Sequence, residues 1–171
     1  DYNELPSVKQ VTKDIGYEVE LVDEFANGYK FDNGSVVDNV LTDDNGKAVE
    51  KFKSVTFRYL KDNDEVLFSQ DKVNSQVETN GEVVANVDGV DVYYHSYTNK
   101  LVPPDYKMTD EDKKAEETGE LVFSYGSSKV EIKEIQSVSW KKDDMNYQLL
   151  QIDGKLSADE LVEMAKEVIG K

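Results

Sequence analysis

The chain has no cysteine among its 171 residues, and it has only one histidine and one tryptophan. Without cysteine there is no disulfide framework, no thiolate metal site and no cysteine nucleophile. Because protein zinc sites are built mainly from cysteine and histidine, a single histidine excludes a zinc centre of the usual kind. The absence of disulfides fits the cytosol, and it also fits export by a bacterium that uses few disulfides.

Basic residues are also scarce. Lys and Arg number 20 against 36 Asp and Glu, so the formal net charge is −16. A chain of that charge is repelled by phosphate backbones and by anionic lipid surfaces, which argues against nucleic-acid binding and against membrane docking through basic residues. The aromatic fraction of 10% favours a folded, acidic domain over a disordered acidic segment.

Long hydrophobic segments are missing as well. No apolar run approaches the roughly 18–20 residues that span a bilayer, and no signal peptide is recognisable. The chain begins at Asp1 rather than Met, so we expect an upstream segment that would carry any export signal or membrane anchor. At roughly 100–200 residues per domain, the length predicts a single domain over 1–171, with its core over about 5–169.

Helix signals stand at the two ends of the chain. Near the start, Ser7 and Gln10 have capping-box spacing, and Gly16 follows as a stop. Near the finish, Ser157 and Glu160 repeat the capping box. Each predicted helix has one apolar stripe: Val8, Val11, Thr12 and Ile15 in the first, and Leu161, Met164, Ala165 and Val168 in the second. Each stripe needs a partner surface that covers it.

Between these helices the apolar period changes to two, which predicts strands. The predicted strands lie at 17–21, 55–59, 66–68, 90–94, 121–123, 130–132, 138–140 and 147–152. Hairpin turns are predicted at Asn33-Gly34, Asn45-Gly46, Asn80-Gly81 and Asp88-Gly89. Connections this short leave no room for βαβ crossovers. We therefore expect an α+β fold, with a twisted, mainly antiparallel sheet flanked by N-terminal and C-terminal helices.

The stretch 99–119 departs from this pattern. It contains Pro103-Pro104 and then a charge-dense run in which Thr109 can cap a short helix. Asp110 and Lys114 have the i,i+4 spacing of a helical ion pair. Because the run has almost no apolar face, we interpret it as a charged, solvated surface excursion. A partner-binding lobe is the alternative.

Few residues have the character of a catalytic centre. His95 is the single histidine, and it shares one strand face with Tyr93 and Tyr97. A Ser–His–Asp triad requires a serine and an acid beside it in space, which the sequence does not place. We predict no catalytic residue and take Tyr93, His95 and Tyr97 as weak candidates for a ligand-binding face. Trp140 ends a strand pattern and is predicted to lie in the core.

Carboxylates are plentiful, but they do not form a recognisable metal motif. The run from Asp43 to Gly46 is similar to the middle of a calcium loop, yet Leu41 and Phe52 stand at its first and last ligand positions. A hairpin turn explains this run better, and the same reasoning applies to 62–64. We predict no metal centre and no cofactor, with adventitious surface calcium as the remaining alternative.

A broader pattern joins the C-terminal third to the start of the chain. It consists of Gly119-Glu120-Leu121, Ser124-Tyr125-Gly126, Val138-Ser139-Trp140, Asn146-Tyr147-Gln148-Leu149 and Leu156-Ser157-Ala158-Asp159-Glu160-Leu161 with Met164-Ala165, together with the opening stretch 5–17. This pattern resembles the bacterial domain of unknown function 4367. That domain is the extracytoplasmic C-terminal part of membrane-anchored, anti-sigma-factor-like proteins of Gram-positive bacteria.

The resemblance implies an extracytoplasmic setting, on the cell surface or secreted, and a fold of the Mog1/PsbP type. It carries over no catalytic residue. We therefore predict a non-enzymatic sensory or interaction domain that binds a protein partner or an envelope ligand and is held at the membrane only through an upstream anchor. Two alternatives stay open: a secreted or surface-attached hydrolase that uses a carboxylate pair, and a structural spacer domain.

Overall fold

The computed structural model describes residues 1–72 and 81–171. Along the chain its elements are α1 (Val8–Ile15), β1 (Lys30–Thr42), β2 (Ala48–Lys61), β3 (Asp64–Asp71), β4 (Glu82–Val87), β5 (Val90–Val102), α2 (Asp110–Glu117), β6 (Leu121–Tyr125), β7 (Glu131–Lys142), β8 (Met145–Ile152) and α3 (Ala158–Ile169).

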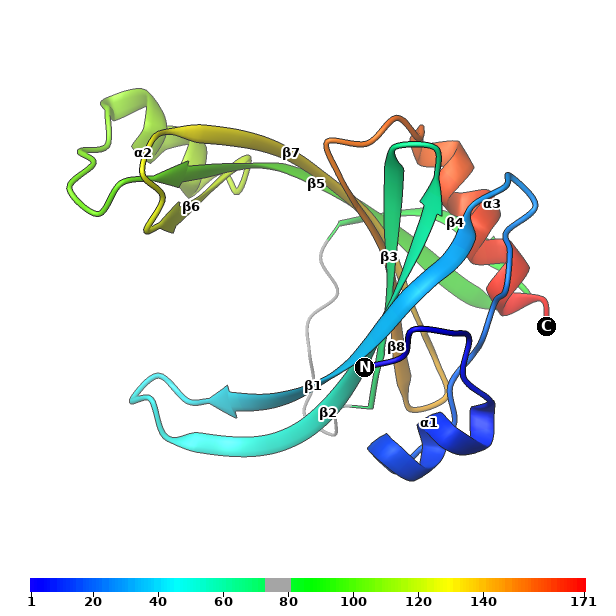
Figure 1. The fold of residues 1–171 in the computed structure, drawn as a ribbon. Coiled ribbons are helices and arrows are strands. Elements are labelled where there is room, and N and C mark those ends of the chain that lie inside the picture. The colour runs from blue at the N-terminus through cyan, green and yellow to red at the C-terminus, as the bar shows by residue number, and fades with distance from the viewer. Residues whose placement is uncertain (73–80) are drawn as a thin grey trace.

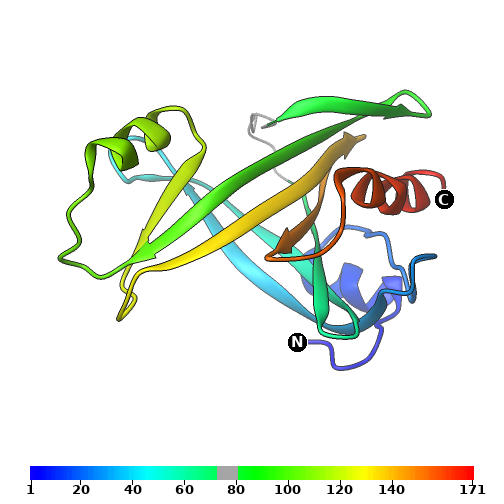
Figure 2. The same cartoon turned by 90° about the horizontal axis from the view of Figure 1, so that it is seen from above.

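The strands form one open eight-stranded sheet in the order β1-β2-β3-β8-β7-β5-β4, with β6 paired to β5. All pairings are antiparallel except that of β5 with β6. The sheet is strongly curved, and α1 and α3 lie on one side of it (Figure 1). Figure 2 shows β5 and β7 running past these helices toward α2. The predicted α+β fold with a mainly antiparallel sheet and terminal helices is confirmed.

The terminal helices begin and end as their caps predict. The Ser7 hydroxyl accepts from the Gln10 backbone N–H, and Gly16 ends α1 with φ 92°. At α3, Ser157 and Glu160 cap each other reciprocally, and each accepts the other's backbone N–H. The predicted stripe of α3 is buried. In α1 only part of the stripe is buried, because Val8 stays 39% exposed.

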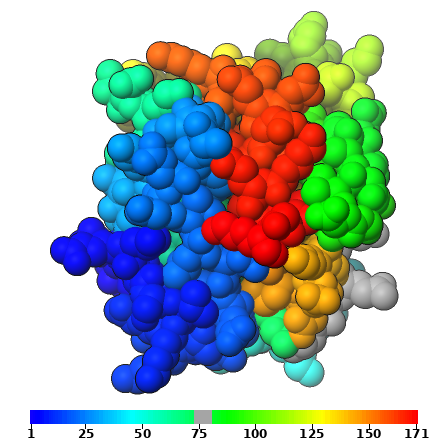
Figure 3. Space-filling view, turned by 90° about the vertical axis from the view of Figure 1, so that its right-hand side faces the viewer, coloured from blue at the N-terminus to red at the C-terminus, as the bar shows by residue number. Residues whose placement is uncertain are grey.

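The core lies between these helices and the sheet. Its largest fully buried side chains include Tyr59, Phe57 and Phe68. Trp140, predicted to be core, is 2% exposed and stacks on Tyr147 with ring centroids 5.4 Å apart. Figure 3 shows the covered side, where α3 lies between the N-terminal segments in blue and the β4–β5 region in green.

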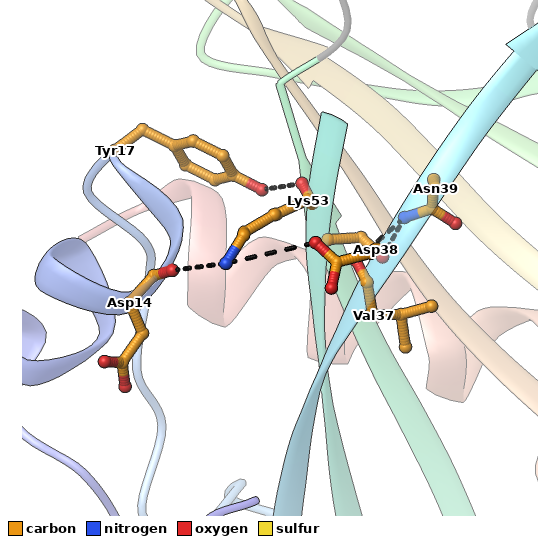
Figure 4. Close-up of polar contacts among 7 residues, drawn as sticks. Asp14, Tyr17, Val37, Asp38, Asn39 and Lys53 are labelled. Atoms are coloured by element: carbon orange, nitrogen blue, oxygen red, sulfur yellow. Dashed lines mark hydrogen bonds and ion pairs between the residues drawn. The ribbon is translucent and has the colours of Figure 1, made fainter. Parts of the chain in front are cut away.

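A small polar cluster ties α1 to the β1–β2 hairpin (Figure 4). The Lys53 ammonium of β2 donates to the Asp14 carbonyl in the last turn of α1 over 3.2 Å, and it lies 3.9 Å from the Asp38 carboxylate. The Tyr17 hydroxyl donates back to the Lys53 carbonyl over 2.6 Å. A cation at the C-terminal end of a helix is favourably placed against the helix dipole, so Lys53 adds a polar link to the burial of Val11 and Ile15 that holds α1 on the sheet.

Two sequence predictions about strand connections are wrong. Residues 17–21 do not join the sheet; they run alongside it, and the Gln70 side chain instead of a neighbouring strand bonds the Glu20 backbone. A βαβ crossover does occur, because the chain leaves β5, forms α2 and returns as β6 parallel to β5. The stretch 99–119 is long enough to hold that helix, which the argument from short connections overlooked.

Of the four predicted hairpin turns, two are confirmed, one is wrong and one lies partly outside the described residues. Asn45-Gly46 and Asp88-Gly89 do form turns, with φ 76° at Gly46 and 84° at Gly89. Asn33-Gly34 does not, because both residues lie inside β1. At Gly34 a Cβ atom would stand 2.6 Å from the Phe57 ring, so close packing explains this glycine. The pair Asn80-Gly81 begins outside the described residues.

Candidate functional site

The helices α1 and α3 lie on one side of the sheet, and α2 is bonded through Asp112 to Lys100, which shares the β5 face of Tyr94 on that same side. No described helix packs against the opposite face. We call this opposite face the open face. Strand register places a row across it: His95, Ser137, Leu150, Leu67 and Arg58 lie side by side on β5, β7, β8, β3 and β2. These side chains are half-buried, and Ser137 is 6% exposed. The open face is therefore a packed surface rather than a fully solvated one.

Tyr93 and Tyr97 flank His95 on the same face, as the strand alternation predicted, and the rings of His95 and Tyr97 lie 5.4 Å apart. The row beside Tyr93 is polar: Ser139, Gln148, Ser69 and Thr56 follow it across the sheet, and the last two hydroxyls hydrogen-bond over 2.9 Å. The row beside Tyr97 is apolar, with Ile135 and Ile152. Along β5 the open face thus changes from hydrogen-bonding groups beside Tyr93 to aliphatic groups beside Tyr97.

No catalytic arrangement forms around His95 among the described residues. Its cross-strand neighbour is Ser137, but no hydrogen bond joins the two side chains, and no described carboxylate pairs with the imidazole. On this side burial raises the pKa of the Asp71 carboxyl, while a hydrogen bond from Asn146 over 2.8 Å acts in the opposite direction. Among the described residues, the groups that act on the Asp71 carboxyl are Asn146 and Lys141, and neither is an acid.

The carboxylates of the calcium-like runs serve the fold. One Asp43 carboxylate oxygen accepts from the backbone N–H groups of Asn45 and Lys47, which closes the β1–β2 turn. One Asp64 oxygen accepts from the Tyr29 hydroxyl over 2.7 Å and from the Gln151 amide over 3.0 Å. Across residues 1–72 and 81–171, no group of three or more His, Asp or Glu side chains is placed to hold a metal ion.

A pocket of about 300 Å³ lies on the helix side of β5 and β7, beneath the loop that leads into α3. Its walls include Tyr94, Ser96, Glu134, Gln136, Gly154 and Leu156. Tyr94 and Ser96 alternate with Tyr93, His95 and Tyr97 along β5, so the pocket and the open face lie on opposite sides of one strand. Sequence analysis missed this pocket because Gly154 and Leu156 come from a loop whose path over the sheet has no local signal.

A chain of hydrogen bonds supports the pocket from behind. The Tyr94 hydroxyl donates to Gln136 over 2.9 Å, and the Gln136 amide donates to Gln151 over 3.0 Å. Gln151 is 1% exposed and donates to Asp64. Because the polar groups of a buried network are costly to leave unpaired, these bonds hold β5, β7, β8 and the start of β3 in a fixed relation. The back wall of the pocket is therefore rigid.

The stretch 99–119 contains regular secondary structure and one buried carboxylate. Its first four residues belong to β5, and Asp112 of α2 is 7% exposed. The Asp112 carboxylate accepts from the Tyr106 hydroxyl over 2.6 Å and from the Lys100 ammonium over 2.9 Å. These two bonds, Tyr106 first, hold the pKa of Asp112 well below its usual range. We call α2, β6 and the loop 103–109 the α2 lobe.

The sequence held part of the signal for this cluster. Thr109 caps α2 as predicted, and Asp112 completes a capping box with it. The expected helical pair of Asp110 with Lys114 is replaced by Asp110 with Lys113, whose charged atoms lie 3.7 Å apart. The partnership of Lys100 with Asp112 depends on how α2 folds back on β5, so no sequence spacing shows it.

Comparison with known proteins found no match to the chain among family models, curated proteins or solved structures. The resemblance to the bacterial domain of unknown function 4367 and the Mog1/PsbP-type fold therefore stay predictions. None of the described helices combines the length and the apolar character needed to cross a membrane.

Proposed function

We propose that the chain is a non-enzymatic sensory or interaction domain that works outside the bacterial cytoplasmic membrane, and that it binds an envelope ligand or partner protein on the open face. The observation that carries this proposal is the row of half-buried His95, buried Ser137 and half-buried Leu150, flanked by Tyr93 and Tyr97, on a face that no described helix packs against. Aromatic rings beside hydrogen-bonding and aliphatic groups on rigid strands are typical of a recognition surface.

The chemistry of the open face favours binding over turnover. Its rows offer hydroxyl and amide groups, while the imidazole of His95 contacts the ring of Tyr97 and forms no ion pair with a described acid. General acid–base catalysis requires a base within hydrogen-bond reach of the proton that it moves, oriented by a third group. The described residues supply no such orienting group for His95, so a hydrolase with His95 as its base has less support. The carboxylate-pair alternative is tested separately below, through Asp71.

The extracytoplasmic part of the proposal rests on the sequence resemblance of the terminal segments. The acidic surface and the lack of cysteine are compatible with export, and they do not by themselves require it. Expression of the full-length protein in its host, followed by protease treatment of intact cells, tests this part. Cleavage of the domain in intact cells supports it, and protection until the cells are lysed contradicts it.

The binding part is tested with envelope material itself. Purified peptidoglycan sacculi and lipoteichoic acid from a Gram-positive bacterium are mixed with the domain, and the bound fraction is measured by co-sedimentation. We expect His95→Ala and Tyr97→Ala to reduce binding at least about tenfold, a loss of 1.4 kcal/mol. Tyr125→Ala is the matched control, because this tyrosine is 56% exposed and lies outside the open face.

Two other results would replace the proposal. Hydrolysis of generic ester, glycoside or peptide substrates that Asp71→Asn abolishes would favour the hydrolase. Absence of both binding and turnover would favour the structural spacer.

A further inference from the structure

We propose that the pocket beneath the α3 loop binds an organic cation, through an alkylammonium or guanidinium group that is either free or at the end of a side chain. This site lies on the opposite side of β5 from His95, since Tyr94 and Ser96 point there, and of its lining residues Ile135 alone belongs to an open-face row. Its volume of about 300 Å³ is at the lower end of the range of about 300–1,000 Å³ for ligand pockets, which suits a group of that size.

The side-chain donors of two lining residues, Tyr94 and Gln136, are already engaged within the protein, and the third, the Ser96 hydroxyl, can both donate and accept. The Tyr94 hydroxyl donates to the Gln136 carbonyl oxygen over 2.9 Å. The Gln136 amide nitrogen donates to Gln151 over 3.0 Å and to the Leu156 carbonyl over 2.7 Å, so both of its protons are engaged. What Tyr94 and Gln136 still offer inside the pocket is oxygen lone pairs. A ligand that bonds to them must donate.

Glu134 adds a negative charge to this acceptor-rich wall. Its two carboxylate oxygens both lie 3.1 Å from the Thr98 hydroxyl, which supplies a single proton, so the carboxylate has free acceptor positions. No lysine or arginine is among the lining residues. An anionic ligand is repelled here, whereas an ammonium or guanidinium group matches both the charge and the donors.

The remaining walls fit the body of such a ligand. Leu156 provides aliphatic contact for a methylene stem, and the face of a tyrosine ring such as Tyr94 attracts a cation. The position of the loop is fixed from below: a Cβ atom at Gly154 would overlap the Gln151 side chain, 1.7 Å from its amide carbon. The pocket is thus formed before any ligand arrives, which keeps the ordering cost of binding small.

The test is an NMR titration of the ¹⁵N-labelled domain at constant ionic strength. The probes are agmatine, n-butylamine and an Nα-acetylated arginine amide, with n-butanol and butyrate as matched neutral and anionic controls. We expect the cations to shift the backbone amide signals of Ser96, Gln136 and Gly154, and the two controls to leave them unchanged. Preference for agmatine indicates a free amine, and preference for the blocked arginine indicates a peptide side chain.

Two carboxylate variants on β7 separate the pocket from the general acidity of the chain. Glu134→Gln is expected to weaken cation binding at least about tenfold, whereas Glu131→Gln, on the same strand outside the pocket, leaves it unchanged. Equal weakening by both variants, equal shifts with butyrate, or no shift at these three amides would overturn the proposal. His95→Ala is expected to leave the titration intact, so failure of this proposal and failure of the open-face proposal are distinguishable.

Discussion

The Gln70 side chain forms two hydrogen bonds with the backbone of Glu20. The Gln70 amide nitrogen donates to the Glu20 carbonyl over 2.8 Å, and the Gln70 carbonyl oxygen accepts from the Glu20 N–H over 2.7 Å. Gln70 is fully buried in β3. The amide thus acts as a neighbouring strand would, and it holds the extended segment 17–21 against the core without making it part of the sheet.

Replacing this amide tests its role directly. We expect Gln70→Met to lower the free energy of unfolding by about 1–3 kcal/mol, because both backbone groups of Glu20 lose their partner. Gln70→Glu is expected to be worse at neutral pH, since a carboxylate then faces the Glu20 carbonyl. Urea denaturation measures both, with Gln148→Met on the half-buried open face as the matched control, within about 0.5 kcal/mol of wild type.

The Gln70→Glu variant also has an expected pH dependence. Burial beside an acceptor raises the pKa of the new carboxyl in the folded state above its unfolded value of about 4.3. A raised folded pKa means that stability is retained at low pH and is lost as the pH rises. Below about pH 4 the variant is therefore expected to approach wild type at the same pH, because a protonated carboxyl can donate to the Glu20 carbonyl and accept from its N–H as the amide does. A stability difference that does not change with pH would contradict this placement of the Glu20 carbonyl.

The Asp112 carboxylate is expected to make the α2 lobe sensitive to acid. Its folded-state pKa is depressed, by the Tyr106 hydroxyl first and then by Lys100. The stabilisation is present above the unfolded value of about 3.9 and is lost as the pH falls through the folded value. The protection factors of the α2 amides, which correct for the slower chemical exchange in acid, should therefore fall before those of the central strands.

Asp112→Asn gives the same test at neutral pH. We expect it to increase exchange in α2, because an amide cannot replace a carboxylate that accepts from Tyr106, Lys100 and the Thr109 backbone. Asp110→Asn is the control, since the Asp110 side chain is 99% exposed. Equal effects of the two variants would show that general helix charge, and not the buried cluster, stabilises the lobe.

Gly34 tests the close packing of β1 on the core. A Cβ atom there would stand 2.6 Å from the Phe57 ring and 3.2 Å from the Tyr2 ring. Because Phe57 is fully buried and has little room to move, we expect Gly34→Ala to lower the free energy of unfolding by about 1–3 kcal/mol. Ser35→Ala, one position along β1 and on the opposite face, should stay within about 0.5 kcal/mol of wild type in the same denaturation experiment.

The buried tyrosines are expected to limit stability at high pH. Burial raises the pKa of Tyr2, Tyr17 and Tyr147 to about 12 from the usual value of 10.0. Raised folded values mean that stability is complete below the unfolded pKa of about 10 and is lost as the pH rises above it. Absorbance near the phenolate band and far-UV circular dichroism, followed together, should show late tyrosine ionisation that coincides with alkaline unfolding.

A phenylalanine variant tests how much one of these tyrosines, Tyr2, contributes to the loss of stability at high pH. Tyr2→Phe removes a titrating group and the hydrogen bond to Asp14 of 2.8 Å. We expect a loss of about 0.5–1.5 kcal/mol at neutral pH and a shallower fall of stability between about pH 10 and 12. A fall as steep as that of wild type would mean that Tyr2 ionises in the folded protein as it does when unfolded.

The sequence predicted correctly the features that depend on residues within one or two helical turns of each other. The caps at Ser7 and Ser157 and the stop at Gly16 depend on neighbouring backbone groups, and all three were predicted correctly. The strands β1 and β4 were missed, because each is an edge strand with several exposed apolar residues and a weak alternation. The turn predicted at Asn33-Gly34 was wrong, because the sequence does not distinguish a glycine required for close packing from a glycine required for positive φ.

In the candidate site too, part of the arrangement follows from local sequence and part only from the tertiary structure. The common face of Tyr93, His95 and Tyr97 follows from the period of a strand, which needs no tertiary information. Their neighbours Ser137, Leu150 and Leu67 follow only from the order of β5, β7, β8 and β3, which joins segments far apart in the chain. The pocket at Glu134 and Gly154 depends in addition on the path of a loop across the sheet.

By itself the amino-acid sequence determined the class of fold, the two terminal helices and the acidic character, since each depends on composition or on residues within a few positions of one another. Tertiary structure alone decided which face of the sheet no described helix covers, that Lys100 meets Asp112, and that Gln70 reaches Glu20. These contacts join residues that are distant in the chain or separated by a loop. The periodicity of a segment shows which of its faces is buried, but it does not show which distant residue lies against that face.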